Sequence, residues 1–202
     1  MTIELEAGEA IGPELDLRPR PAILIGGACA IGLISALSLP WPMAVASTML
    51  GTLMIAGADV DARTFLLPDL ITIGALFCGI LVAPLLDTSE PWAAAVQTIA
   101  RAGIVGGALA LFRSFYGWIR KIEGLGLGDV KLAAAIGAWL PLDAIALCFG
   151  LATSGALVTV VVARLSGQAV MRTTRIPFGA FLCPALWIVF FADSVMRSGG
   201  AQ

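Results

Sequence analysis

The residue best suited to chemistry in this sequence is Asp129, which stands between a glycine-rich stretch and an apolar run. The stretch before it contains three alternate glycines, Gly124, Gly126 and Gly128. Glycine lets a backbone approach its neighbours closely, so these positions leave room for a substrate chain and for a second side chain. A carboxylate at membrane depth is energetically costly and usually serves function. We therefore expect Asp129 to be catalytic, and a role as a helix N-cap is compatible with that.

A second pair of acids, Asp59 and Asp61, closes an earlier apolar run and offers a partner carboxylate. Two carboxyl groups that share one site do not both ionise readily, so the pKa of one of them rises. The protonated group acts as an acid, while the ionised group accepts a proton from a water molecule that attacks a peptide carbonyl. The pattern predicts an aspartic-protease site that needs neither metal nor cofactor. Spacing alone does not choose between Asp59 and Asp61.

The remaining charged residues have more ordinary expected roles. Asp69 follows Pro68 at the expected start of a helix, where a carboxylate stabilises the first turn. Lys131 either reaches lipid headgroups or tunes the aspartate pair, and Arg101 either finds an ion-pair partner or extends to the membrane surface. The acids expected to be solvated lie in turns or near the end of the last apolar run: Asp87, Glu90, Asp143 and Asp193.

The composition is that of a membrane protein. Of the 202 residues, 59% are apolar and 13% are charged, whereas a soluble domain carries about 25% charged residues. The sequence contains no histidine, which excludes histidine-ligated metal sites and Ser-His or Cys-His catalysis. The four cysteines stand alone in apolar runs without a CxxC pair, which excludes a zinc ribbon. A net charge of −2 without a basic block gives no indication of nucleic-acid binding.

The apolar runs predict an all-α polytopic membrane protein with seven transmembrane segments, near residues 22–39, 43–60, 70–86, 92–112, 129–140, 144–163 and 176–192. The fifth segment is too short for a hydrocarbon core of about 30 Å unless the glycine-rich stretch adds depth. A charged loop is expected around the amphipathic residues 115–122. Three regions are expected along the chain: a cytoplasmic N-terminal tail at 1–20, a single membrane domain at 21–195 and a C-terminal tail at 196–202.

The basic residues predict the orientation in the membrane. With the N-terminus in the cytoplasm and seven crossings, ten of the 12 lysines and arginines lie on the cytoplasmic side, as the positive-inside rule requires. These ten are Arg18, Arg20, Arg63, Arg113, Arg120, Lys121, Lys131, Arg164, Arg172 and Arg175. The same topology places Asp59, Asp61 and Asp129 together at the cytoplasmic face, a result that does not depend on the acids themselves.

Three blocks of the sequence resemble the type IV prepilin peptidases, a family of GxGD aspartyl proteases. Residues 124–140 (GLGLGDVKLAAAIGAWL) resemble the GxGD block of the family. Residues 61–72 (DARTFLLPDLIT) resemble its first block, in which an aspartate stands seven residues before a proline, here Pro68. Residues 176–187 (IPFGAFLCPALW) resemble a late I-P-F-G-P-F-L block, with Ala180 where proline is usual. The resemblance extends over about residues 43–192.

The resemblance implies that Asp61 and Asp129 are the catalytic pair in a six-helix protease core preceded by one N-terminal helix. The supporting motif positions are Gly126, Gly128, Lys131, Pro68 and Asp69. The implied substrate is a prepilin or pseudopilin with a short basic leader, cleaved after a glycine at the cytoplasmic face of the bacterial inner membrane. Many members also methylate the new N-terminus with S-adenosylmethionine and carry an N-terminal domain with paired CxxC motifs. Because the sequence has neither a CxxC motif nor room for that domain, peptidase activity alone is expected, with the lipid bilayer and the prepilin as partners and no cofactor.

Three other classes of membrane protein agree with parts of the sequence. Presenilin-type proteases pair GxGD with a Tyr-Asp block, but the single tyrosine, Tyr116, precedes Gly117. A small transporter or channel component would use the aspartates as an ion or proton path, for which acids spread through the spans are expected rather than a cluster at one face. A non-catalytic assembly protein leaves the paired acids unexplained.

Overall fold

The computed structural model describes residues 16–87, 89–121, 126–167 and 176–199. Within these ranges the chain forms helices and no strands: α1 (Pro21–Ser38), α2 (Trp41–Thr64), α3 (Asp69–Leu86), α4 (Pro91–Arg120), α5 (Leu127–Trp139), α6 (Leu142–Leu165) and α7 (Gly179–Gly199). Six of these helices are long and apolar enough to cross a membrane, whereas α5 has 13 residues. The predicted all-α polytopic fold with a short fifth segment is confirmed.

The end of α2 lies further along the chain than its apolar run indicates. The helix continues to Thr64 and stops where Phe65 adopts a left-handed conformation with a φ of 56°. The N–H of Phe65 still donates to the carbonyl of Asp61, which closes the last turn. Asp61 is therefore part of a helix rather than of a loop. Hydropathy marks where a run stops being apolar, but a helix ends only where its backbone hydrogen bonds stop.

Two further boundaries correct the predicted spans. Helix α4 has 30 residues and continues to Arg120, so most of the predicted charged loop is helical. Ile122 and Glu123, which belong to that prediction, lie outside the described residues. Helix α7 begins at Gly179 rather than at Ile176, because the carbonyl of Phe178 accepts the first backbone N–H groups of the helix.

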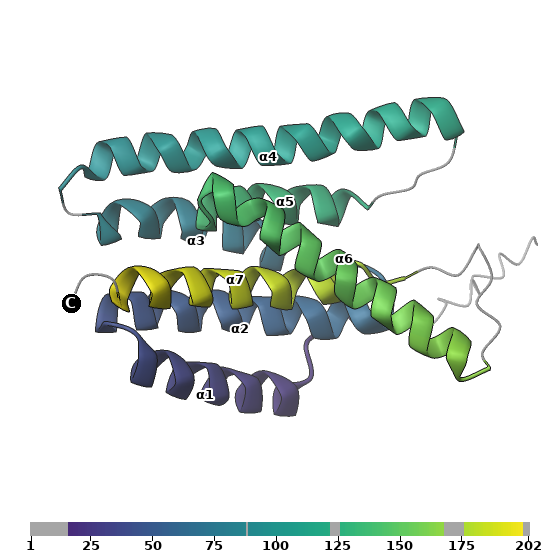
Figure 1. Ribbon diagram of the computed structural model, residues 1–202, viewed down its shortest axis with the longest axis horizontal. Coiled ribbons are helices and arrows are strands. Elements are labelled where there is room, and N and C mark those ends of the chain that lie inside the picture. Colours follow the sequence, from purple (N-terminus) through teal and green to yellow (C-terminus); the bar gives the residue numbers. More distant parts are fainter. Residues whose placement is uncertain (1–15, 88, 122–125, 168–175, 200–202) are drawn as a thin grey trace, which may run out of the picture.

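The helices pack in layers that place α2 near the middle of the bundle (Figure 1). Helix α2 contacts α1 on one side and both α3 and α7 on the other, while α5 packs against α3 and α4. Helix α6 crosses the bundle obliquely and packs against α7 (Figure 1). Helices α1 and α4 form the two outer edges in this view. Three helices, α3, α5 and α7, begin at the end of the bundle where α2 finishes.

Helix α5 is the most deeply enclosed element, and small residues allow its close packing. A side chain at Gly137 would meet the backbone oxygen of Arg101 at 2.5 Å, so α4 and α5 touch backbone to backbone there. The guanidinium of Arg101 donates to the carbonyl of Gly137 (3.3 Å) and to the hydroxyl of Thr98 (3.1 Å). The indole of Trp139 donates to the carbonyl of Ala75 on α3 (2.7 Å). Arg101 thus supports the carboxyl end of α5, where a cation is favourable.

Candidate active site

Asp61 projects from the last turn of α2 toward the start of α7. Its side chain is buried, with the residue 4% exposed. One carboxylate oxygen accepts a hydrogen bond of 2.7 Å from the backbone N–H of Ala180, and the N–H of Gly179 also donates to the carboxylate. The N-terminus of a helix carries unpaired N–H groups and the positive end of the helix dipole, both of which stabilise a carboxylate. The N-terminus of α7 thus binds the carboxylate of Asp61.

Gly179 is the residue that lets α7 approach this closely. A Cβ atom at this position would lie 2.9 Å from the Cγ atom of Asp61 and 2.3 Å from a methyl carbon of Leu67. Any larger residue would therefore displace the carboxylate or the chain that follows α2. The sequence argument named neither Gly179 nor Ala180 as part of the site, although the block at residues 176–187 contained the signal.

Asp129 lies in the first turn of α5, next to the glycines that precede it. The N-cap of this helix is Gly126, so Asp129 is not the N-cap that its position in the sequence allowed. The carboxylate of Asp129 instead accepts a hydrogen bond from the backbone N–H of Gly126. This is one half of a capping-box arrangement, in which a side chain in the first turn satisfies the N–H of the cap residue.

Gly128 accounts for the close approach of α5 to the chain that leaves α2. A Cβ atom at Gly128 would lie 2.8 Å from the Cβ atom of Leu67. Leu67 therefore lies against both Gly128 and Gly179, the two glycines next to the aspartates. The glycines before Asp129 were expected to leave room for a substrate chain and for a second side chain, and in the structure the neighbour of Gly128 is Leu67 of the same chain.

The two carboxyl groups are close enough to interact. Burial, and then the charge of Asp61, raise the pKa of Asp129 to about 6, against the opposing effect of the Gly126 N–H. Asp129 lies in α5, outside the six helices long enough to cross a membrane. Near pH 6 the carboxyl group of Asp129 is therefore about half protonated. In the described part of the chain, no group of three or more Cys, Asp or Glu side chains has an arrangement that could hold a metal ion.

Lys131 and Asp69 form an ion pair between the first turns of α5 and α3, with the Lys131 Nζ atom 2.5 Å from a carboxylate oxygen. Lys131 was expected to reach headgroups or to tune the aspartate pair, and its observed partner is a different acid. Asp69 is the first residue of α3 and Pro68 is its N-cap residue, which agrees with the predicted helix start. Both charged side chains are substantially exposed, so the pair contributes little to stability.

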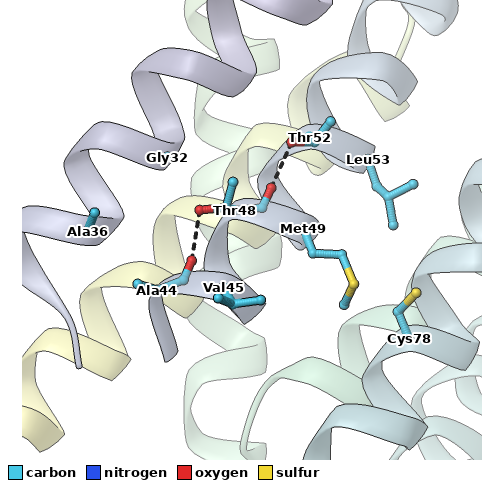
Figure 2. A pocket seen from close by; sticks show the side chains of 9 residues that line it. All are labelled: Gly32, Ala36, Ala44, Val45, Thr48, Met49, Thr52, Leu53 and Cys78. Atoms are coloured by element: carbon cyan, nitrogen blue, oxygen red, sulfur yellow. Dashed lines mark hydrogen bonds between the residues drawn. The ribbon is translucent and has the colours of Figure 1, made fainter. Parts of the chain in front are cut away.

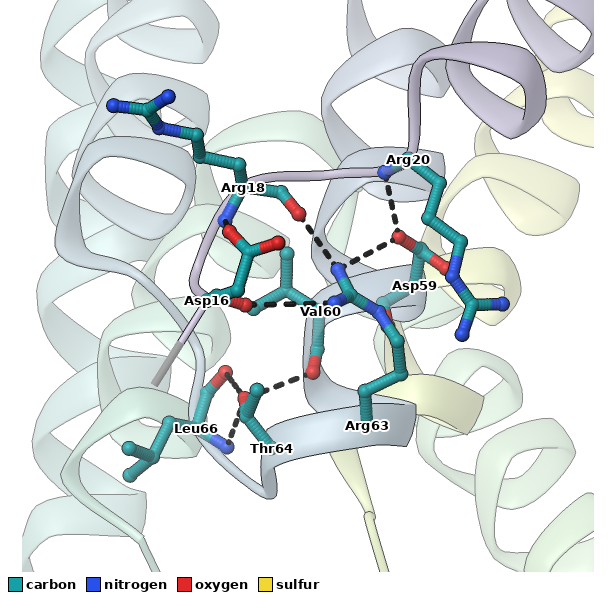
Figure 3. A network of polar contacts seen from close by, with 8 residues as sticks. All are labelled: Asp16, Arg18, Arg20, Asp59, Val60, Arg63, Thr64 and Leu66. Carbon is teal, nitrogen blue, oxygen red and sulfur yellow. Dashed lines mark hydrogen bonds and ion pairs between the residues drawn. The ribbon is translucent and has the colours of Figure 1, made fainter. Parts of the chain in front are cut away.

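Asp59, the alternative to Asp61, faces other partners (Figure 3). Its carboxylate pairs with Arg63 at 3.0 Å and accepts the backbone N–H of Arg20 at 2.9 Å. Because Asp59 and Asp61 are two residues apart on a helix, their side chains point to nearly opposite faces. The structure therefore brings Asp61, and not Asp59, to the start of α7.

One cavity lies apart from the two aspartates. It has a volume of about 710 Å³ and lies along the first half of α2, between α1 and Cys78 of α3 (Figure 2). The hydroxyl groups of Thr48 and Thr52 donate to carbonyls four residues earlier, so the lining is apolar. Its last lining residue on α2, Leu53, is about 12 Å along the helix from Asp61.

Comparison with known proteins decides the family. Residues 48–167, more than half of the chain, match the type IV leader peptidase family. The chain belongs to this family. The matched region contains both Asp61 and Asp129, as well as the whole of α3, α4 and α5.

Curated members of the type IV leader peptidase family are similar to large parts of the chain. A prepilin leader peptidase/N-methyltransferase of Xanthomonas campestris is 31% identical over 166 residues, covering 76% of this chain and 54% of the relative. A protein of the same name from Burkholderia pseudomallei is 34% identical over 160 residues, covering 79% of this chain and 50% of the relative. Another from Dickeya chrysanthemi is 42% identical over 90 residues, covering 44% of this chain and 30% of the relative. The chain spans about half the length of the Xanthomonas and Burkholderia relatives, and no solved structure matches it.

Membership of this family and the six long apolar helices make the chain a multi-pass membrane protein of the bacterial leader peptidase type. The resemblance seen in the three sequence blocks is confirmed. The roles of Asp61, Asp129 and the supporting residues remain predictions, as do the three regions of the chain.

Proposed function

We propose that this chain is a membrane-embedded aspartic endopeptidase that removes the leader of type IV prepilins or pseudopilins. The observation that carries the proposal is the position of two acids from separate helices, Asp61 of α2 and Asp129 of α5, at one end of the bundle, where the charge of Asp61 acts on Asp129. Relatives of similar sequence are named prepilin leader peptidases, which supports this substrate class. The proposal concerns the peptidase step alone.

The two acids have different surroundings, which suggests different roles. Two N–H groups at the start of α7 donate to the carboxylate of Asp61, whereas one N–H group, that of Gly126, donates to Asp129. The pKa of Asp129 is raised to about 6, which favours its protonated form. We therefore assign Asp61 as the general base and Asp129 as the general acid at the start of the reaction.

The chemistry follows from these roles. Asp61 takes a proton from a water molecule while the water oxygen attacks the carbonyl carbon of the scissile peptide. Asp129 gives its proton to the carbonyl oxygen, which forms a neutral tetrahedral diol. The proton held by Asp61 then passes to the peptide nitrogen, the C–N bond breaks, and Asp129 recovers a proton from a diol hydroxyl. The products are a leader with a carboxyl end and a mature chain with a free amine.

The proposed orientation places this chemistry at the cytoplasmic face of the bacterial inner membrane. The end of the bundle that carries Asp61 and Asp129 also carries Arg63, Arg120 and Lys131, close to helix ends. A concentration of basic residues is the mark of a cytoplasmic face. An N-terminus in the cytoplasm is consistent with this arrangement.

The proposal is tested by co-expression with a candidate prepilin in a host that lacks its own prepilin peptidase. Leader removal is followed on a gel for the wild type, Asp61→Asn and Asp129→Asn, at matched membrane levels. Asparagine keeps the shape of the side chain but supplies no carboxyl proton, so both variants should lose cleavage. Asp143→Asn, an exposed acid at the first turn of α6, serves as the matched control. Cleavage that persists in both dyad variants would remove the aspartyl mechanism, and a wild type inactive on several prepilins would favour a transport role.

A further inference from the structure

The chain before α1 lies across the end of α2 and is held there by one arginine (Figure 3). The guanidinium of Arg63 donates to the carbonyl of Arg18 at 2.7 Å and to the carbonyl of Asp16 at 3.4 Å. The same nitrogen that reaches Arg18 also lies 3.0 Å from the carboxylate of Asp59. One side chain of α2 therefore binds two main-chain carbonyls that are more than 40 residues away in sequence.

Asp59 completes the attachment from the other side. Its carboxylate oxygen accepts the N–H of Arg20 at 2.9 Å, and its side chain is only 7% exposed. An exposed ion pair four residues apart on a helix would contribute little. Here both partners also bind main-chain groups of residues 16–20, so the two side chains and the segment form one hydrogen-bonded network. The pair Asp59–Arg63 thus tethers a segment of backbone.

The tether lies on the face of α2 opposite Asp61. Residues two apart on a helix are separated by about 200° around its axis, so Asp59 points to the N-terminal segment while Asp61 points to α7. The last turn of α2 is consequently held on both sides, by residues 16–20 and by the start of α7. Because α2 ends at Thr64, no further helical turn follows to hold Asp61 in place.

We propose that residues 16–20, Asp59 and Arg63 form a clasp that positions the catalytic carboxylate of Asp61. The inference rests on the proposed function, since it gives the clasp a part in the same reaction. Asp59 and Arg63 are positioning residues, because they act through the turn that carries Asp61 and touch no substrate. Misplacing a catalytic group by about 1 Å costs up to a hundredfold in rate, so release of the clasp should lower kcat.

The clasp uses the N–H group of Arg20, and this allows a matched pair of variants. Arg20 has a φ of −66° and a ψ of 122°, which proline adopts without strain. Arg20→Pro removes both the N–H donor and the side-chain charge, whereas Arg20→Ala removes only the side chain. The two variants therefore differ in the hydrogen bond to Asp59 and not in net charge.

The kinetic experiment measures kcat and KM for cleavage of a prepilin by the full chain in detergent. Arg20→Pro and Arg63→Ala should each lower kcat about ten- to a hundredfold without raising KM, and Arg20→Ala should lower it far less. The double variant Arg20→Pro/Arg63→Ala should be no worse than either single variant, because each opens the same clasp. Equal kcat values for Arg20→Pro and Arg20→Ala, or additive losses in the double variant, would overturn the proposal.

Hydrogen exchange tests the clasp without reference to activity. Pro19 and Pro21 have no N–H, so exchange in residues 17–21 reports only on Leu17, Arg18 and Arg20. In Arg63→Ala the amide of Arg20, which donates to Asp59, should exchange at least about tenfold faster than in the wild type, with the rest of the bundle unchanged. Unchanged exchange would show that no clasp exists. If the wild type cleaves no prepilin, the proposed peptidase function fails, and the exchange rates alone decide whether the segment is held.

Discussion

The carboxylate of Asp61 and the backbone N–H of Ala180 meet at 2.7 Å across 119 positions of sequence. This contact joins the last turn of α2 to the first turn of α7, next to the start of α5. It also explains why a glycine precedes Ala180, since a Cβ atom at Gly179 would lie 2.9 Å from the Asp61 carboxyl carbon. The contacts around this pair and within the bundle lead to four predictions beyond the dyad and clasp experiments.

Gly179→Ala should nearly abolish prepilin cleavage while leaving the protein folded. The added methyl group would collide with Leu67 and with Asp61, and the carboxylate would have to move. We expect a loss of roughly a hundredfold in kcat, as for other displacements of a catalytic group. Gly150→Ala, in open space on α6, is the control and should retain activity. Wild-type rates for Gly179→Ala would show that the close approach of α7 is unimportant.

The pH dependence of cleavage should reflect the protonated form of Asp129. Its pKa is raised to about 6, so the acid form is lost as the pH rises through that value. We expect kcat to fall with increasing pH above about 6, approaching tenfold per pH unit, provided that chemistry is rate-limiting. A kcat that increases steadily from pH 6 to pH 8 would contradict the assignment of Asp129 as the acid.

Asp61→Asn should lower the pKa of Asp129. Burial is the larger cause of the raised pKa and remains in this variant, but the charge of Asp61 is removed. The carboxyl stretching band of Asp129, followed by infrared difference spectroscopy, should therefore titrate at a lower pH than in the wild type. Asp129→Asn identifies the band. An unchanged titration would mean that the two carboxyl groups do not interact. This conclusion does not depend on which substrate the protein cleaves.

Gly137→Ala should destabilise the bundle, because the new methyl group would lie 2.5 Å from the backbone oxygen of Arg101. Overpacking of this kind typically costs about 1–3 kcal/mol. Gly103→Ala, on the open side of α4, should be neutral or slightly stabilising, since alanine is the better helix former. The midpoints of thermal unfolding in detergent compare the two variants, and similar midpoints would argue against close α4–α5 packing.

Several features of this protein follow from the sequence alone. Long apolar runs must form helices in lipid, because every backbone polar group there needs an internal partner. The seven described helices, of which the fifth is short, were therefore predictable. Asp129 was also identifiable, since a carboxylate beside three alternate glycines is a local pattern. The boundaries were less accurate: α2 and α4 continue past their apolar runs, because polar residues at a membrane surface can remain helical.

The partners of the aspartates were decided by the tertiary structure. Asp59 and Asp61 follow the same apolar run, and the physical argument from spacing did not separate them. Their environments come from residues far away in sequence: Arg20 binds Asp59, and Ala180 binds Asp61. Local hydropathy is a property of each segment, whereas a hydrogen-bond partner depends on which helix ends converge. That convergence is set by packing at positions such as Gly128 and Gly179, whose contacts appear only once the chain is folded.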